Sequence, residues 1–154
     1  MGHGLEGEAR AALTARREEL KAQYLQPRDR RPASSARGVH HTAHISSDVE
    51  HTIRFYVDIC GFPLLELFEN RDYQGSTHFF FDLGHGNTLA YFDLPGLDVG
   101  AYQEVLGGHH HLAISMQRAE WEAARARLEA AGIEYAHVDG SSLYFRGPTA
   151  NAWS

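Results

Sequence analysis

One short pattern occurs twice in the chain, and this repeat restricts the possible folds more than any other feature. His-Thr-Ala at 41–43 matches His-Leu-Ala at 111–113. In each half a glycine follows the histidine at a similar distance: Gly61 lies 20 positions on and Gly132 lies 21 positions on. Between them, each half favours a strand followed by a helix. The chain is therefore expected to contain two related modules that share a core.

The first module is predicted to span residues 38–95. Asp48 is the expected N-cap of its helix and Gly61 the expected end, because a short acidic side chain caps helix amides and glycine tolerates a left-handed turn. Alternating apolar residues and Gly/Asn-rich turns mark the strands. In chain order, the predicted elements are a strand at 39–46, a helix at 48–60, and strands at 62–69, 77–83 and 88–94.

The second module, residues 108–154, repeats this order. Its predicted elements are a strand at 109–116, an amphipathic helix at 118–131, and strands at 133–138 and 142–146. The last strand of this module is expected to be truncated. Residues 1–37 are predicted to be an extra N-terminal helix, over about residues 5–25, and a proline-containing linker.

Composition excludes several classes of partner. The formal net charge is −6 and no basic stripe is present, so neither nucleic acid nor an anionic membrane is an expected partner. No apolar run is long enough to cross a bilayer. Cys60 is the only cysteine, which rules out an intrachain disulfide and favours a buried structural thiol. A cytoplasmic location is the expectation.

Histidine is the residue type that suggests a site. Six of the 11 histidines fall in two bursts, one opening each module. His41 and His111 occupy equivalent positions in the repeat, so a pseudo-twofold axis could bring both imidazoles to one divalent metal. The alternative is a pair of strand histidines that form hydrogen bonds within a polar cavity.

The same stretches resemble the vicinal oxygen chelate superfamily, which includes glyoxalase I, extradiol dioxygenases, and fosfomycin- and bleomycin-resistance proteins. The likeness covers about residues 38–148. It rests on Gly38-Val39-His40-His41-Thr42-Ala43, Ser47-Asp48-Val49-Glu50, Thr52-Ile53-Arg54-Phe55-Tyr56-Val57-Asp58-Ile59-Cys60-Gly61-Phe62, His110-His111-Leu112-Ala113-Ile114-Ser115 and Ser142-Leu143-Tyr144-Phe145-Arg146. The resemblance implies an α+β fold of two βαβββ modules whose mixed sheet curls around a cavity.

By this resemblance His41 and His111 take the two histidine ligand positions. His40, His110 and His44 are expected on the opposite strand face, and His109 on the face of His111.

The family's third ligand is a glutamate on the last strand, where the register places Ser154. Its first-half counterpart falls near Tyr91, and Asp93 is a conceivable substitute, although it could simply begin the turn before Pro95. The α-carboxylate of Ser154 is a third option. The missing glutamate raises the hypothesis that the chain is a shortened form of a longer enzyme.

Two functions follow from the resemblance. The first is a metal-dependent lyase or ring-cleavage dioxygenase, in which Fe, Mn, Ni or Zn chelates neighbouring oxygens of a small-molecule substrate. Tyr91, Asp93 and Phe80 are the candidate substrate contacts, and no general base is assigned. The alternative is a metal-free protein that binds or sequesters a small molecule, as bleomycin-resistance proteins do. A homodimer is expected in either case, because family members commonly dimerise and a truncated strand leaves a sheet edge open.

Overall fold

The computed structural model describes residues 7–101, 103 and 105–148, and the chain divides into two compact units, residues 1–37 and 38–154. The N-terminal unit contains the predicted helix as α1 (Gly7–Tyr24). Ion pairs such as Lys21–Glu18, at 2.7 Å, lie along its exposed surface. No helix in the described part of the chain is long and apolar enough to cross a membrane.

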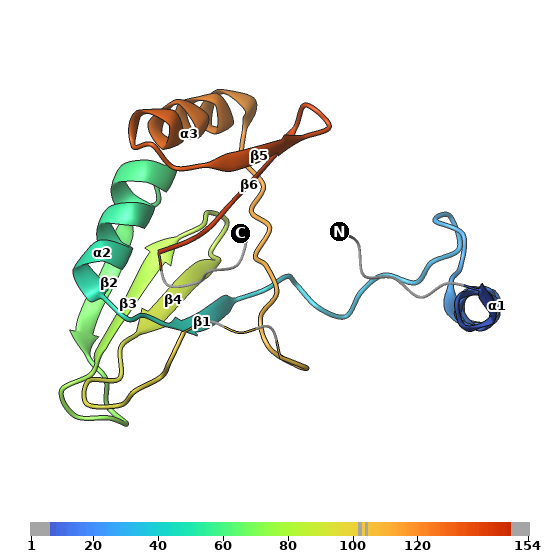
Figure 1. Cartoon of the computed structure of the whole chain (residues 1–154), viewed down its shortest axis with the longest axis horizontal. Coiled ribbons are helices and arrows are strands. Elements are labelled where there is room, and N and C mark those ends of the chain that lie inside the picture. Colours follow the sequence, from blue (N-terminus) through green and yellow to red (C-terminus); the bar gives the residue numbers. More distant parts are fainter. Residues whose placement is uncertain (1–6, 102, 104, 149–154) are drawn as a thin grey trace. The chain divides into compact units, whose positions relative to one another are not determined.

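The larger unit contains a four-stranded sheet with the order β1-β4-β3-β2 (Figure 1). β1 runs parallel to β4, whereas β3 is antiparallel to both β4 and β2. All four strands predicted for the first module are confirmed. Their bounds are β1 (His41–Ile45), β2 (Leu64–Glu69), β3 (Thr77–Asp82) and β4 (Thr88–Phe92).

A helical segment connects β1 to β2 and has the ends that the sequence predicts. It consists of α2 (Val49–Arg54) and a π-helical continuation, η1 (Phe55–Cys60). The Asp48 carboxylate accepts a 2.8 Å hydrogen bond from the His51 amide, which caps the first turn. Gly61 ends the segment at φ +79°, a backbone conformation that residues with a Cβ adopt only at a cost in free energy.

The core lies between this helical segment and one face of the sheet. Phe79, Phe81 and Leu89 are fully buried and pack against Phe55 and Tyr56 of η1. Strand alternation places the two phenylalanines on the same face of β3. The opposite face of the sheet carries His41 and Phe80.

The second half also folds as predicted from its helix onward. α3 (Arg118–Ala130) leads into a two-stranded sheet of β5 (Tyr135–Val138) and β6 (Ser142–Phe145). Phe145 packs against Phe55, with ring centroids 6.0 Å apart, so this half shares the core of the first. The α+β class is confirmed.

The strand predicted at 109–116 is wrong, because residues 109–116 form no strand. Its counterpart β1 pairs with β4 alone. Within the described residues no strand follows β6, so the described part of the second half contains no counterpart of β4. A strand needs a partner for its backbone groups, and this requirement overrides a favourable local pattern.

Replacing Phe79 with alanine should lower the free energy of unfolding by about 3–5 kcal/mol, because the ring is fully buried and leaves a cavity. Leu67, its cross-strand partner on β2, is 54% exposed and provides the matched control. Leu67→Ala should cost about 0.5 kcal/mol or less. Urea unfolding measures both, and equal losses would contradict the assigned core.

Candidate functional site

His41 opens β1 on the face of the sheet that the helical segment leaves uncovered. It lies opposite Thr88 of β4, and its ring is 6.3 Å from that of Phe80. Its Nδ1 is 2.8 Å from Nδ1 of His40, so one of these nitrogens donates and the other accepts. This pairing engages Nδ1 and leaves Nε2 of His41 as the nitrogen suited to a ligand.

His111 has the same local geometry as His41. Its Nδ1 is 2.7 Å from Nδ1 of His110, and the two rings are 5.0 Å apart at 80°. The corresponding rings of His40 and His41 are 5.1 Å apart at 79°. The sequence repeat therefore extends to side-chain geometry. In each pair the rings meet, although strand alternation had predicted that they would point to opposite faces.

The surroundings of the two candidate ligands differ. His41 stands on a regular strand beside Phe80, whereas His111 lies on irregular backbone and lines a cavity. Over residues 7–101, 103 and 105–148, no three histidine, cysteine, aspartate or glutamate side chains are grouped to hold a metal ion. Ser154, the position of the expected third ligand, lies outside the described residues.

The histidine contact that links the two halves involves His44 and His109, whose ring centroids are 4.6 Å apart. Burial lowers the pKa of His44, and the neighbouring His109 lowers it further. Burial also lowers the pKa of His109, followed by the effects of His111 and His110. Sequence reasoning missed this contact, because alternation places His44 on the inner face of β1 but does not identify a partner from the other half.

His78 is the second residue that sequence reasoning missed. Its ring lies among Phe68, Phe80 and Phe92, 4.4 Å from Phe80, on the same face as His41. Its Nε2 is a buried nitrogen without a hydrogen-bond partner. Burial lowers the pKa of His78, nearby His41 lowers it further, and Glu66 opposes the shift. The sequence did contain a signal for this placement, because His78 and Phe80 are two positions apart on β3 and therefore share one face of the strand.

The three predicted substrate contacts occupy different environments. Phe80 lies beside His41, as described above. Tyr91 pairs with His44 in the β1–β4 register, so it lies on the core face, where its hydroxyl is 2.8 Å from that of Tyr56. The Asp93 carboxylate accepts a 2.5 Å hydrogen bond from the Thr77 amide. Tyr91 and Asp93 therefore make structural contacts that the sequence did not predict.

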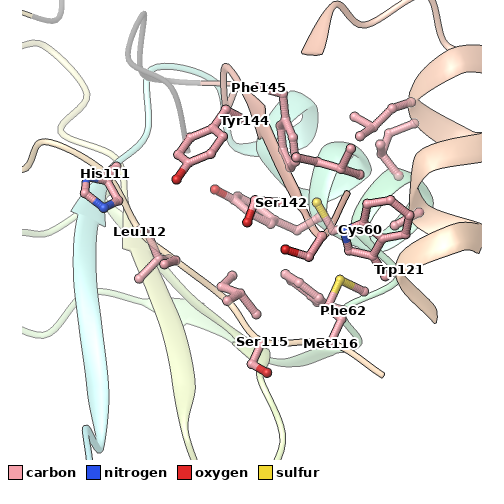
Figure 2. Close-up of a pocket in the computed structure, with 18 residues that line it drawn as sticks. Cys60, Phe62, His111, Leu112, Ser115, Met116, Trp121, Ser142, Tyr144 and Phe145 are labelled. Carbon is pink, nitrogen blue, oxygen red and sulfur yellow. The ribbon is translucent and has the colours of Figure 1, made fainter. Parts of the chain in front are cut away.

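An apolar cavity of about 350 Å³ lies between η1, α3, β6 and the segment that begins at His111 (Figure 2). Its labelled lining includes Phe62, Trp121 and Tyr144, with the hydroxyls of Ser115 and Ser142. Among the described residues that line it, none is acidic or carries a permanent positive charge. The size and lining suit a small uncharged molecule or apolar side chains.

Cys60 lines the same cavity as a buried thiol. Burial raises its pKa to about 12, and the nearby Arg127 guanidinium only partly opposes this rise. The thiolate is the nucleophilic form, so the thiol is poorly reactive at neutral pH. This environment agrees with the structural role predicted for Cys60.

Comparison with known proteins assigns the family. The model of the Glyoxalase/Bleomycin resistance protein/Dioxygenase superfamily matches residues 38–153, and the chain belongs to this superfamily. No curated protein sequence matches the chain significantly.

Three solved structures illustrate the shared fold. A glyoxalase/bleomycin resistance protein/dioxygenase domain from Frankia sp. EAN1pec is 20% identical, with a TM-score of 0.65 over 77% of this chain and 89% of its own. The trypanothione-dependent glyoxalase I of Leishmania major is 19% identical, with a TM-score of 0.60 over 75% and 82%. A mutant of the fosfomycin resistance protein FosX from Listeria monocytogenes, complexed with Mn(II) and 1S,2S-dihydroxypropylphosphonic acid, is 22% identical. Its TM-score is 0.53 over 77% and 89%.

Iodoacetamide should modify Cys60 slowly in the native chain. A pKa near 12 lowers the thiolate fraction at pH 8 by roughly a thousandfold, and higher intrinsic nucleophilicity restores only part of the rate. Native labelling should therefore be at least roughly thirtyfold slower than labelling in urea. Mass spectrometry follows the reaction at this single cysteine, and similar rates in both conditions would show that the thiol is accessible and ionised.

Proposed function

We propose that the chain binds a divalent metal through His41 and His111 and acts on a small molecule with neighbouring oxygens, as a lyase or a dioxygenase. The main support is the matched geometry of the two histidines, each with its Nδ1 next to that of the preceding histidine. When the candidate ligand donates from Nδ1 in this contact, its Nε2 is unprotonated and oriented for ligation. The identity of the metal, whether Fe, Mn, Ni or Zn, is left open by two imidazole donors.

The imidazoles of His41 and His111 are suitable donors for two of the coordination positions of such a metal. When bound, the metal would supply Lewis acidity, polarising the substrate oxygens that it chelates. Phe80, which lies beside His41, would orient the substrate. On this face of β4, the residues opposite His41 and Ala43 are Thr88 and Ala90, both smaller than Phe80.

The open face around His41 adds a second supporting observation. The buried Nε2 of His78 has no partner, and such an atom costs free energy until a ligand or water satisfies it. A substrate oxygen at this face would accept a hydrogen bond from His78 or donate one to it, depending on the tautomer. His78 is therefore an additional candidate for substrate binding.

We also propose that the functional unit is a homodimer. His41 and His111 have different neighbours within one chain, so a site that uses both could combine His41 of one copy with His111 of another. A small-molecule substrate is the only other partner in this proposal.

Metal content after purification without chelators tests the proposal. The wild type should contain near-stoichiometric metal, and His41→Ala and His111→Ala should each lose most of it, because each removes one of two imidazole donors. His51→Ala is the matched control, since His51 is exposed on α2 and its side chain contributes no ligand. Metal retained in both site variants, or lost equally in the control, would contradict the assignment.

Mixing the two single variants tests the dimeric site. If one metal is held between two copies, a mixed dimer of His41→Ala and His111→Ala retains one intact pair of ligands. Part of the metal binding should then return on mixing. If the site lies within one chain, mixing restores nothing.

The apolar cavity favours one alternative function, metal-free binding of a small apolar molecule. Its 350 Å³ volume lies within the usual range for ligand sites. A wild type that takes up no Fe(II), Mn(II), Ni(II) or Zn(II) but binds such molecules would support the alternative over the metal site.

A further inference from the structure

The N-terminal helix α1 carries an exposed apolar stripe along one face. At about 100° per residue, the four side chains of the stripe lie within about 60° of one another around the helix axis: Ala9, Leu13, Leu20 and Tyr24. No residue of α1 is buried, and Leu13 and Tyr24 are 53% and 69% exposed. Helices of this kind owe most of their stability to packing of the apolar face. The stripe therefore indicates that α1 packs against a partner.

Basic side chains border this stripe on both sides. Helical spacing places one of the four cations of α1 on one side and three on the other: Arg16, and then Arg10, Arg17 and Lys21. The three acidic side chains of the helix lie on its opposite half. Two of the cations form ion pairs within α1, but both pairs are solvent-exposed, and such pairs contribute little free energy. The face of α1 therefore fits an apolar surface with an acidic border.

The two units of the chain carry opposite net charges. Residues 1–37 contain 8 of the 14 Lys and Arg side chains and 5 of the 20 Asp and Glu side chains, which gives a net charge of +3. Residues 38–154 therefore carry a net charge of −9. Because opposite charges attract, these charges favour the larger unit of this protein as the partner of α1.

β2 presents an apolar surface with an acidic border at one outer edge of the four-stranded sheet. Among the described strands it pairs only with β3. Leu65 and Leu67 are 52% and 54% exposed, and Glu66 and Glu69 are exposed beside them. Strand alternation puts these two carboxylates on opposite faces, so one lies on each side of the edge. β1, the other outer strand, has no acidic residue. Covering an apolar edge with a helix is one of the ways in which proteins protect it.

We propose that α1 of one copy docks across the edge of β2 in a second copy, and that the second copy returns the same contact. The apolar stripe would cover Leu65 and Leu67, and its basic border would meet the two carboxylates. The lengths agree, because Leu13 to Tyr24 spans about 16 Å of helix and β2 spans about 16 Å of strand. Both surfaces are exposed within one chain, so a second copy can reach them. A twofold pair of chains forms the contact twice, and it needs no metal.

Charge reversal in the full chain tests this contact. Sedimentation equilibrium measures association in the presence of a chelator, so that a dimer linked by metal does not contribute. The wild type should form a dimer whose dissociation constant rises with salt concentration. Arg16→Glu with Arg17→Glu, or Glu66→Lys with Glu69→Lys, should each raise the dissociation constant by at least about tenfold. Combining all four substitutions restores opposite charges and should return it to within about threefold of the wild type.

Two further variants separate this contact from general effects of charge and folding. Arg28→Glu with Arg30→Glu makes the same change in net charge outside α1, and should alter the dissociation constant by less than about twofold. Arg17→Glu with Glu66→Lys is a smaller reversal that keeps the 2.8 Å hydrogen bond from the Gly75 amide to Glu69. Because the contact joins two copies, it is lost on dilution, and the unfolding of the dilute chain does not depend on it.

Three results would overturn the proposal. The first is a wild type that stays monomeric in chelator at every concentration tested, which would leave α1 to its own chain or to a different protein. The second is equal weakening of association by the linker control, which would show that only net charge matters. The third is a folded combined variant that associates no better than the single reversals, which would show that the two surfaces do not meet. The metal content of the wild type is measured separately, so the metal site and this contact can fail independently.

Discussion

The contact between Arg127 and the end of η1 connects the two halves of the larger unit. The Arg127 guanidinium donates to the carbonyl oxygens of Ile59 and Cys60, at 2.6 and 3.3 Å. These carbonyls end a helical segment, where unpaired acceptors and the helix dipole favour a cation. Gly61 allows the approach, because a Cβ at this position would lie 3.0 Å from Nη2 of Arg127. A side chain of α3, in the second half, thus caps the helical segment η1 of the first half.

Much of the fold could be predicted because it depends on local chemistry. Asp48 and Gly61 have the side-chain properties that begin and end a helix, and the structure uses both in this way. The four strands of the first module likewise lie where apolar runs bounded by turn residues predicted them. The segment 109–116 has an equally good strand pattern, but a strand also depends on a neighbour far along the chain. Local sequence carries no information about whether this neighbour is in place.

The candidate site was predicted less completely than the fold. The repeat identified His41 and His111 as equivalent positions, and their matching contacts with His40 and His110 agree with that equivalence. The contact of His44 with His109 was not foreseen, because it depends on how the halves pack. Tyr91 illustrates a further limit: the sequence did not indicate which face of β4 it occupies, and the structure places its hydroxyl 2.8 Å from that of Tyr56 in the core.

The most direct test of the connection between the halves is the free energy of unfolding of Arg127→Leu beside Arg125→Leu. Both arginines lie on α3, but the ion pair that Arg125 forms among the described residues is with Glu129 of the same helix, at 3.3 Å, and its guanidinium lies 5.9 Å from the Trp121 ring. Urea unfolding should show a loss of about 2 kcal/mol for Arg127→Leu, since two carbonyls lose a charged donor. Arg125→Leu should lose about 0.5 kcal/mol or less. Equal small losses would contradict the account, because the halves would then be held together without the Arg127 cap.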